Sequence, residues 1–399
     1  MASLKLLLGW IPSTDKIEGA EKALVAEYEK LKAFAQSDIL KKFIDLKDLV
    51  LSPEFSNKKK EIESLRYKGS DEQAMEKEFA KMQKDKEIKR FFAERNDSEK
   101  SKKFVDLEGT EKLARYEKLA NYLASKEFAD KKEYLLDKKR FEKTEMYKQM
   151  QDYFTLAKDP DILWYFKTKD SKKFDELKAK KMTFSDDFEG TSLNTNVWMS
   201  NYYWGDKLLH DRYSVEPDLQ AYTAENVEVK NSLLKIVTKP QKVMGKSWSE
   251  TKGFSTKEFS YTSGIVNNGN YFRQKYGTFK AKVKLGNPSA KNAFWMLSDK
   301  VTPHIDVCKT EGGKVVCDFF PKAGERSKEA IPSKYANDFY IYTLEWRSDR
   351  MVWSINDVVI KEQTSNVPQE PMYILFSSGL DQPISGQTTM EVDWVKVYE

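Results

Sequence analysis

The chain has 399 residues, of which 33% are charged and 40% are hydrophobic, and its formal net charge is +5. A chain of this length predicts two or three domains with a sizeable core. The small net charge gives no reason to expect a nucleic-acid partner. The two cysteines are too few for a framework of disulfides, which excludes a small disulfide-stapled domain.

The composition changes near residue 182. Residues 1–182 contain 42 basic and 36 acidic side chains, whereas residues 183–399 contain 26 and 27. Thirteen of the 17 glycines and seven of the nine tryptophans lie in the second part. We therefore predict two domains, 1–182 and 183–399.

The N-terminal stretch MASLKLLLGWIPSTDK contains one short apolar run. The run is too short to cross a bilayer and has no clear small-residue cleavage site after it, so we expect packed structure and no transmembrane segment. The location stays open between the cell surface, the extracellular space and a larger particle.

The first part predicts an all-α domain. After the helix-start signal Ser13-Thr14-Asp15, apolar residues recur at intervals of three and four. The expected helices after this first one are segments of about 37–51, 71–93, 111–124, 143–157 and 160–167.

An internal repeat runs through these helical segments. Asp45–Phe55 (DLKDLVLSPEF) resembles Lys118–Phe128 (KLANYLASKEF) at an offset of 73 residues, and Asp85–Phe92 resembles Asp159–Phe166 at an offset of 74. Repeats of this kind predict small helical units that stack on one another. Lysines and carboxylates alternate too closely for a basic surface, so we expect a spacer, a stalk or a module that contacts a protein partner.

The second part changes to the period of two that is typical of strands. Tyr276–Leu285, Phe339–Trp346 and Met351–Ile355 alternate between apolar and polar residues, and Asn356-Asp357 supplies a turn. Short alternating strands with such turns predict an all-β antiparallel sandwich of the jelly-roll type.

A series of short stretches in this part resembles the family-16 glycoside hydrolases, the laminarinase and lichenase group. In chain order they are Phe184–Gly190, Trp198, Asp218–Thr223, Tyr261–Gly264, Tyr276–Leu285, Ala293–Leu297, Tyr342–Trp346, Val367–Met372 and Val392–Tyr398. The resemblance implies a concanavalin A-like fold over residues 183–399 and retaining hydrolysis of β-glucans or galactans by two carboxylates.

The family's catalytic strand reads Glu-x-Asp-x-Glu or, with a bulge, Glu-x-Asp-x-x-Glu. Carried onto this sequence, the nucleophile position is His304, the central aspartate is Asp306, and the acid/base position is Cys308 or Lys309. Both glutamates are thus replaced, and we expect hydrolysis to be absent or very weak, although enzyme activity stays an open question. On a regular strand His304, Asp306 and Cys308 share one face, but their spacing is wide for a zinc site.

Three functions remain open from the sequence. The first is a catalytically degenerate protein that binds a polysaccharide, a β-glucan or galactan, or serves in adhesion. The second is a structural or assembly protein that uses the sandwich as a rigid block. The third is an active retaining hydrolase with rearranged carboxylates, for which Glu311 and Asp318 are the nearest replacements.

Aromatic faces and a few polar groups are what a sugar site needs. The candidate sugar contacts are Trp295, Trp204, Arg212, Gln220 and Asn270. No cofactor is required, but the resemblance implies a structural calcium ion at Asp187 and Asp393. Cys308 and Cys317 would lie opposite each other in a hairpin, either as a disulfide or as two buried thiols. The oligomeric state stays open.

Overall fold

The computed structural model describes residues 4–94, 109–203 and 212–399 and divides into two compact units. One unit combines the residues up to Glu27 with Lys172–Glu399, and the other is Tyr28–Ser171. This division differs from the predicted boundary at residue 182. The N-terminal segment packs with the sandwich, because Leu6 is fully buried and its carbonyl accepts a hydrogen bond of 2.7 Å from the Tyr335 hydroxyl. The helical unit is therefore an insertion within the sequence of the first unit.

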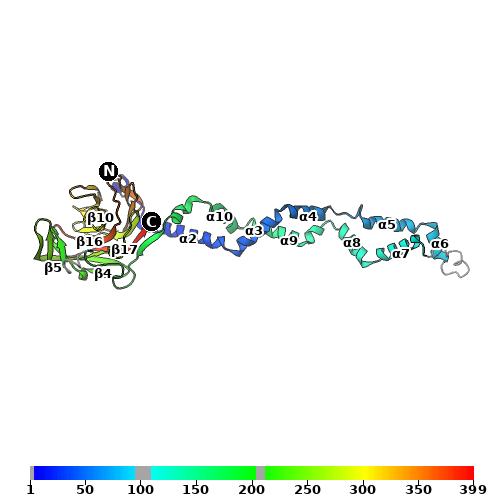
Figure 1. The fold of residues 1–399 in the computed structure, drawn as a ribbon, viewed down its shortest axis with the longest axis horizontal. Coiled ribbons are helices and arrows are strands. Elements are labelled where there is room, and N and C mark those ends of the chain that lie inside the picture. Colours follow the sequence, from blue (N-terminus) through cyan, green and yellow to red (C-terminus); the bar gives the residue numbers. More distant parts are fainter. Residues whose placement is uncertain (1–3, 95–108, 204–211) are drawn as a thin grey trace. The chain divides into compact units, whose positions relative to one another are not determined.

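The helical unit consists of an outgoing and a returning series of helices (Figure 1). The outgoing helices are α2 (Thr14–Ala35), which begins in the other unit, α3 (Asp38–Val50), α4 (Pro53–Ser64), α5 (Asp71–Met82) and α6 (Lys86–Glu94). The returning helices are α7 (Glu111–Leu123), α8 (Lys126–Leu136), α9 (Glu145–Leu156) and α10 (Pro160–Thr168), with the short 3-10 helix η2 (Arg140–Lys143) before α9. The prediction missed α4 and α8 and joined α5 to α6.

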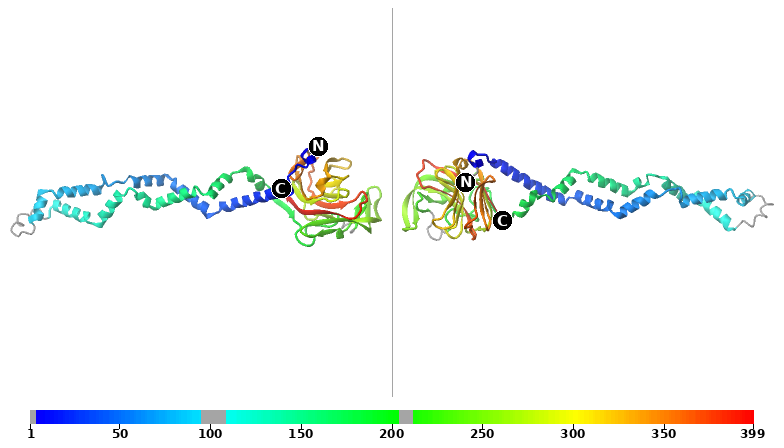
Figure 2. Two further views of the ribbon diagram at one scale, coloured as in Figure 1. Left: turned by 180° about the vertical axis from the view of Figure 1, so that it is seen from behind. Right: turned by 90° about the horizontal axis from the view of Figure 1, so that it is seen from above.

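The two series lie side by side (Figure 2). Phe43 of α3 stacks on Tyr153 of α9 with ring centroids 5.7 Å apart. Arg115 of α7 forms an ion pair of 2.7 Å with Glu78 of α5. Antiparallel pairing thus gives each short helix a partner along its apolar face, which it needs because an isolated helix of this length is marginal in water.

The repeated sequence elements coincide with matching helix starts. The Ser52 and Ser125 hydroxyls each accept a hydrogen bond of 3.1 Å from the backbone N–H three residues later. The residues that donate, Phe55 and Phe128, are both buried. The 73-residue offset therefore marks equivalent caps and core anchors on the outgoing and returning series, while the stacking of independent repeat units stays a prediction.

Two sheets form the predicted sandwich; the smaller is antiparallel, and the larger is antiparallel except for the parallel pairs β2–β5 and β3–β6. The smaller sheet has the order β12-β11-β10-β9-β16-β7. Its strands are β7 (Ile265–Asn267), β9 (Lys291–Leu297), β10 (His304–Glu311), β11 (Lys314–Phe320), β12 (Ser327–Pro332) and β16 (Tyr373–Gly379).

The larger sheet has the order β15-β14-β13-β8-β17-β5-β2-β3-β6, with β1 paired to β17 and β4 to β5. Its strands are β1 (Met182–Asp186), β2 (Tyr213–Val215), β3 (Gln220–Tyr222), β4 (Val227–Val229), β5 (Leu234–Ser249), β6 (Gly253–Ser263), β8 (Gly277–Lys284), β13 (Tyr340–Trp346), β14 (Met351–Ile355), β15 (Val358–Gln363) and β17 (Thr388–Tyr398). Apolar side chains from both sheets fill the space between them, among them Phe279, Phe294 and Trp353, all fully buried. The opposite face of the smaller sheet carries the candidate site.

Candidate functional site

Strand β10 contains a bulge that decides which side chains reach the candidate site. Its pairing with β11 is regular up to Asp306 and resumes at Lys309, and the pairing with β9 shifts between Asp306 and Cys308. One extra residue in a strand reverses the faces of the residues beyond it. Cys308 therefore lies in the core between the sheets, fully buried, and Lys309 lies on the face that carries His304 and Asp306.

The expectation that Cys308 shares a face with His304 and Asp306 is thus wrong, because it assumed a regular strand. The chain adopts the bulged spacing, so Lys309 lies on the face of His304 and Asp306. Cys308 and Cys317 are both free and buried. The Cys317 thiol donates to the Val307 carbonyl at 3.2 Å, and burial raises its pKa above the ordinary value, so it is an inert core thiol.

The three motif side chains form one chain of contacts. His304 Nε2 lies 2.8 Å from Asp306 Oδ1, and Lys309 Nζ lies 2.7 Å from Asp306 Oδ2. Burial alone would raise the pKa of Asp306, but His304 and Lys309 outweigh it and hold this pKa well below its usual range. Both oxygens of the only carboxylate among the three are therefore engaged.

Lys309 is also held from the neighbouring strand. Its ammonium lies 3.0 Å from Asp318 Oδ2. Burial lowers the pKa of Lys309, but the carboxylates of Asp306 and Asp318 raise it more, so the net shift of this pKa is upward. Arg326 Nε donates to Asp318 at 2.7 Å, and the Arg326 guanidinium also pairs with Glu311 at 2.7 Å. Glu311 and Asp318, which the sequence suggested as replacements for the two glutamates, are therefore both paired with cations.

Around these groups lies a cavity of about 330 Å³, which we call the cleft cavity. It is lined by Tyr202, Asp218, Tyr222, Lys291, Ala293, Trp295, Val301, Thr302, His304, Asp306, Lys309, Phe320, Lys322, Ala323, Gly324, Ser377 and Gly379. Trp295 stacks on the His304 ring with centroids 4.8 Å apart and donates its indole N–H to Ser377 at 3.0 Å. Aromatic faces and a few polar groups are the usual lining of a ligand site.

Of the five predicted sugar contacts, the structure places Trp295 in the lining of the cleft cavity. Gln220 is buried and uses its amide to bond Asp218 and the Leu380 N–H. Asn270 and Arg212 are exposed and do not line this cavity. Trp204 lies outside the described residues.

Sequence reasoning missed Asp218, Tyr222 and Lys291 as lining residues. Asp218 and Tyr222 belong to the stretch Asp218–Thr223, which carried the family resemblance and could have indicated them. No sequence pattern indicated Lys291 as a lining residue, because a lysine at the start of a strand is common. Burial raises the pKa of Asp218, although Lys291, 3.5 Å away, opposes this.

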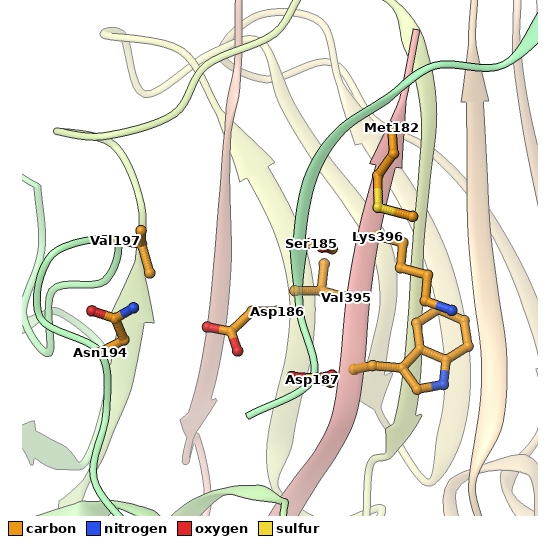
Figure 3. A pocket seen from close by; sticks show the side chains of 9 residues that line it. Met182, Ser185, Asp186, Asp187, Asn194, Val197, Val395 and Lys396 are labelled. Carbon is orange, nitrogen blue, oxygen red and sulfur yellow. The ribbon is translucent and has the colours of Figure 1, made fainter. Parts of the chain in front are cut away.

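The two predicted calcium residues have different surroundings. Asp393 is paired at 2.8 Å with the Lys282 ammonium, which in turn pairs at 2.9 Å with Glu18. Asp187 is exposed on the lining of a second cavity of about 240 Å³ (Figure 3). Within the described ranges, no cluster of three or more His, Cys, Asp or Glu side chains is arranged to hold a metal ion. Calcium binding stays a prediction.

No helix in the part of the chain that the structure describes is both long and apolar enough to cross a membrane.

Comparisons with known proteins agree with the fold of the sandwich. Residues 220–396 match the model of the glycosyl hydrolases family 16. The chain is 27% identical over 247 residues to the endo-1,3-1,4-β-glycanase EglC of Rhizobium meliloti, which covers 54% of this chain and 51% of that protein. It is 26% identical over 273 residues to the glucan endo-1,3-β-glucosidase A1 of Niallia circulans, covering 56% and 38%. The chain thus spans about half the length, or less, of these curated relatives.

Similar solved structures include two glucanases. The laminarinase catalytic domain of Thermotoga petrophila is 20% identical, with 55% of this chain and 98% of that chain covered and a TM-score of 0.45. The endo-β-1,3-glucanase of Pyrococcus furiosus is 19% identical, with 55% and 94% covered and a TM-score of 0.45.

Proposed function

Starting from residues 220–396 as a glycosyl hydrolase family 16 domain, we propose that this chain binds a β-glucan or galactan and does not hydrolyse it. The observation that carries the proposal is the position of Lys309. Its ammonium occupies the acid/base position of the motif and is fixed between the carboxylates of Asp306 and Asp318.

Retaining hydrolysis requires two carboxyl groups about 5–5.5 Å apart, one to attack the anomeric carbon and one to protonate the leaving oxygen. Here the attacking position holds the imidazole of His304, which supplies no permanent negative charge for an oxocarbenium-like transition state. The proton donor is replaced by a paired ammonium whose raised pKa opposes proton release. Asp306 is the one carboxylate of the motif that remains, and its two oxygens face His304 and Lys309.

What supports binding is the lining that remains. The Trp295 and His304 rings are stacked, and Phe320 meets His304 edge-on with centroids 5.2 Å apart. Such rings present apolar faces to the C–H groups of a sugar, while polar side chains such as Ser377 and Asp218 also line the cavity.

The test combines a binding measurement with an activity measurement on the full chain. We expect calorimetry to detect binding of laminarin, lichenan or a galactan, and we expect no release of reducing sugar from any of them. Trp295→Ala should weaken binding at least about tenfold, because it removes the ring beneath His304. Trp394→Ala is the matched control, since Trp394 bonds Glu18 and does not line the cleft cavity. The absence of binding to every glycan on an array would remove the proposal.

One observation favours the rearranged hydrolase as a second candidate. Asp218 and Asp306 both line the cleft cavity, and their environments shift their pKa values in opposite directions, upward for Asp218 and downward for Asp306. Such a divergence is typical of an acid and base pair. This candidate requires reducing-sugar release that Asp218→Asn abolishes without weakening glycan binding.

A further inference from the structure

A group of tyrosines covers one part of the face that carries the cleft cavity. Tyr202 meets the Tyr213 ring edge-on at 5.3 Å between centroids and the Tyr222 ring edge-on at 5.6 Å. All three rings are more than nine-tenths buried. They form one apolar cluster with Trp295 of β9, Ile265 of β7 and Leu375 of β16, so side chains cover the sheet surface at these residues. Farther along β16, Ser377 and Gly379 line the cavity.

A second layer reinforces this closure. Tyr203 packs against Tyr373 of β16 with centroids 5.6 Å apart. The Arg273 guanidinium lies 4.7 Å from the Tyr203 centroid and 5.0 Å from the Tyr373 centroid, and it is tied to Asp299 at 2.6 Å. A glycan that lies over β9 and β10 therefore meets a packed aromatic wall at the β16 side.

The charges in the cleft cavity are also satisfied internally. Lys309 is paired with Asp306 and Asp318, and Lys291 lies 3.5 Å from both Asp218 and Asp381. Lys322 pairs with Glu325 at 2.7 Å. Each charged side chain of the described lining thus has a partner of opposite sign. A charged ligand would have to compete with these pairs, whereas an uncharged sugar leaves them intact.

We infer that the cleft cavity accepts the terminal sugars of an uncharged glycan and not an internal segment of a long chain. This inference rests on the proposed function and specifies its ligand. A groove open at both ends gains contacts with each added sugar, but a pocket closed by Tyr202 and Tyr222 gains none once the terminal units are seated.

Calorimetry on the full chain with laminaribiose, laminaritriose and laminarihexaose tests the inference. We expect the dissociation constants of the trisaccharide and the hexasaccharide to agree within about twofold, whereas an open groove would improve by about tenfold or more. Trigalacturonate should bind at least about tenfold more weakly than laminaritriose, because the ammonium groups of the described lining already face carboxylates.

Two variants probe the wall itself. Tyr222→Ala and, independently, Tyr202→Ala should open the closed side. The affinity for the hexasaccharide should then exceed the affinity for the trisaccharide by at least about threefold. Tyr271→Ala, whose ring is exposed and outside the cluster, should leave the length series unchanged. Affinity that rises steadily with length in the unmodified chain, or tighter binding of trigalacturonate, would overturn the inference and leave glycan binding intact. The absence of binding to all neutral oligosaccharides would instead overturn the proposed function.

Discussion

The helical unit and the sandwich contain the same types of charged residue, but their ion pairs differ in how far they are exposed to water. In the helical unit, many ion pairs lie at the surface, such as Lys42 and Asp152, which are 3.0 Å apart with side chains 58% and 44% exposed. Glu72, paired with Lys131, is buried. In the sandwich, Lys309 is 15% exposed, and the carboxylates that it contacts, Asp306 and Asp318, are 3% and 0% exposed.

This difference means that the number of ion pairs says little about stability. Exposed pairs are screened by water and contribute about 0–1 kcal/mol each. Losing one partner of a buried pair leaves an uncompensated charge in the interior and costs about 3–5 kcal/mol. The exposed pairs of the helical unit should therefore tolerate charge removal that the buried pairs of the sandwich do not.

The largest expected effect is at Lys309. Lys309→Met leaves Asp306 and Asp318 without their shared cation and should lower the free energy of unfolding by about 3–5 kcal/mol. Urea unfolding followed by tryptophan fluorescence measures it, because seven of the nine tryptophans lie in residues 183–399. Lys328→Met is the control, since Lys328 contacts only Glu311 of this network and is 49% exposed. Equal losses in the two variants would contradict the comparison.

The buried lysine Lys361 should make the stability of the sandwich depend on pH. This lysine is buried, its ammonium lies 4.6 Å from the Trp353 ring centroid, and burial lowers its pKa to about 8 from 10.5. Between these two values the unfolded chain binds more protons at this site than the folded chain, so the contribution of Lys361 to stability rises with pH there. We expect Lys361→Met to raise Tm at pH 7 and this advantage to shrink by pH 10. Thermal unfolding at both pH values measures it, and an advantage that grows with pH would contradict the assignment.

The sequence indicated much of the sandwich and only part of the site. The alternation in Tyr276–Leu285 and Phe339–Trp346 predicted β8 and β13, because a sheet with one face in a core forces polar and apolar residues to alternate. The same rule failed at β10. A bulge depends on pairing with both neighbouring strands, and no glycine or proline marked it between Asp306 and Lys309.

Other features could also not be predicted from the sequence. The tyrosines of the wall come from three separate segments, and only folding brings Tyr202, Tyr213 and Tyr222 together. Helices α4 and α8 were missed although Ser52 and Ser125 cap them, because their first turns carry few apolar residues for the periodicity to detect.

The smallest expected effect is in the helical unit. Lys42→Ala removes the ion pair with Asp152 between α3 and α9 and should change the free energy of unfolding by less than about 1 kcal/mol. The pair lies beside the stacked rings of Phe43 and Tyr153, which hold the two helices together without it. Circular dichroism at the helical minimum during urea unfolding measures the change, and raised salt should reduce it further. A loss as large as that of Lys309→Met would mean that the helical unit depends on its charges, and the contrast between the two units would fail.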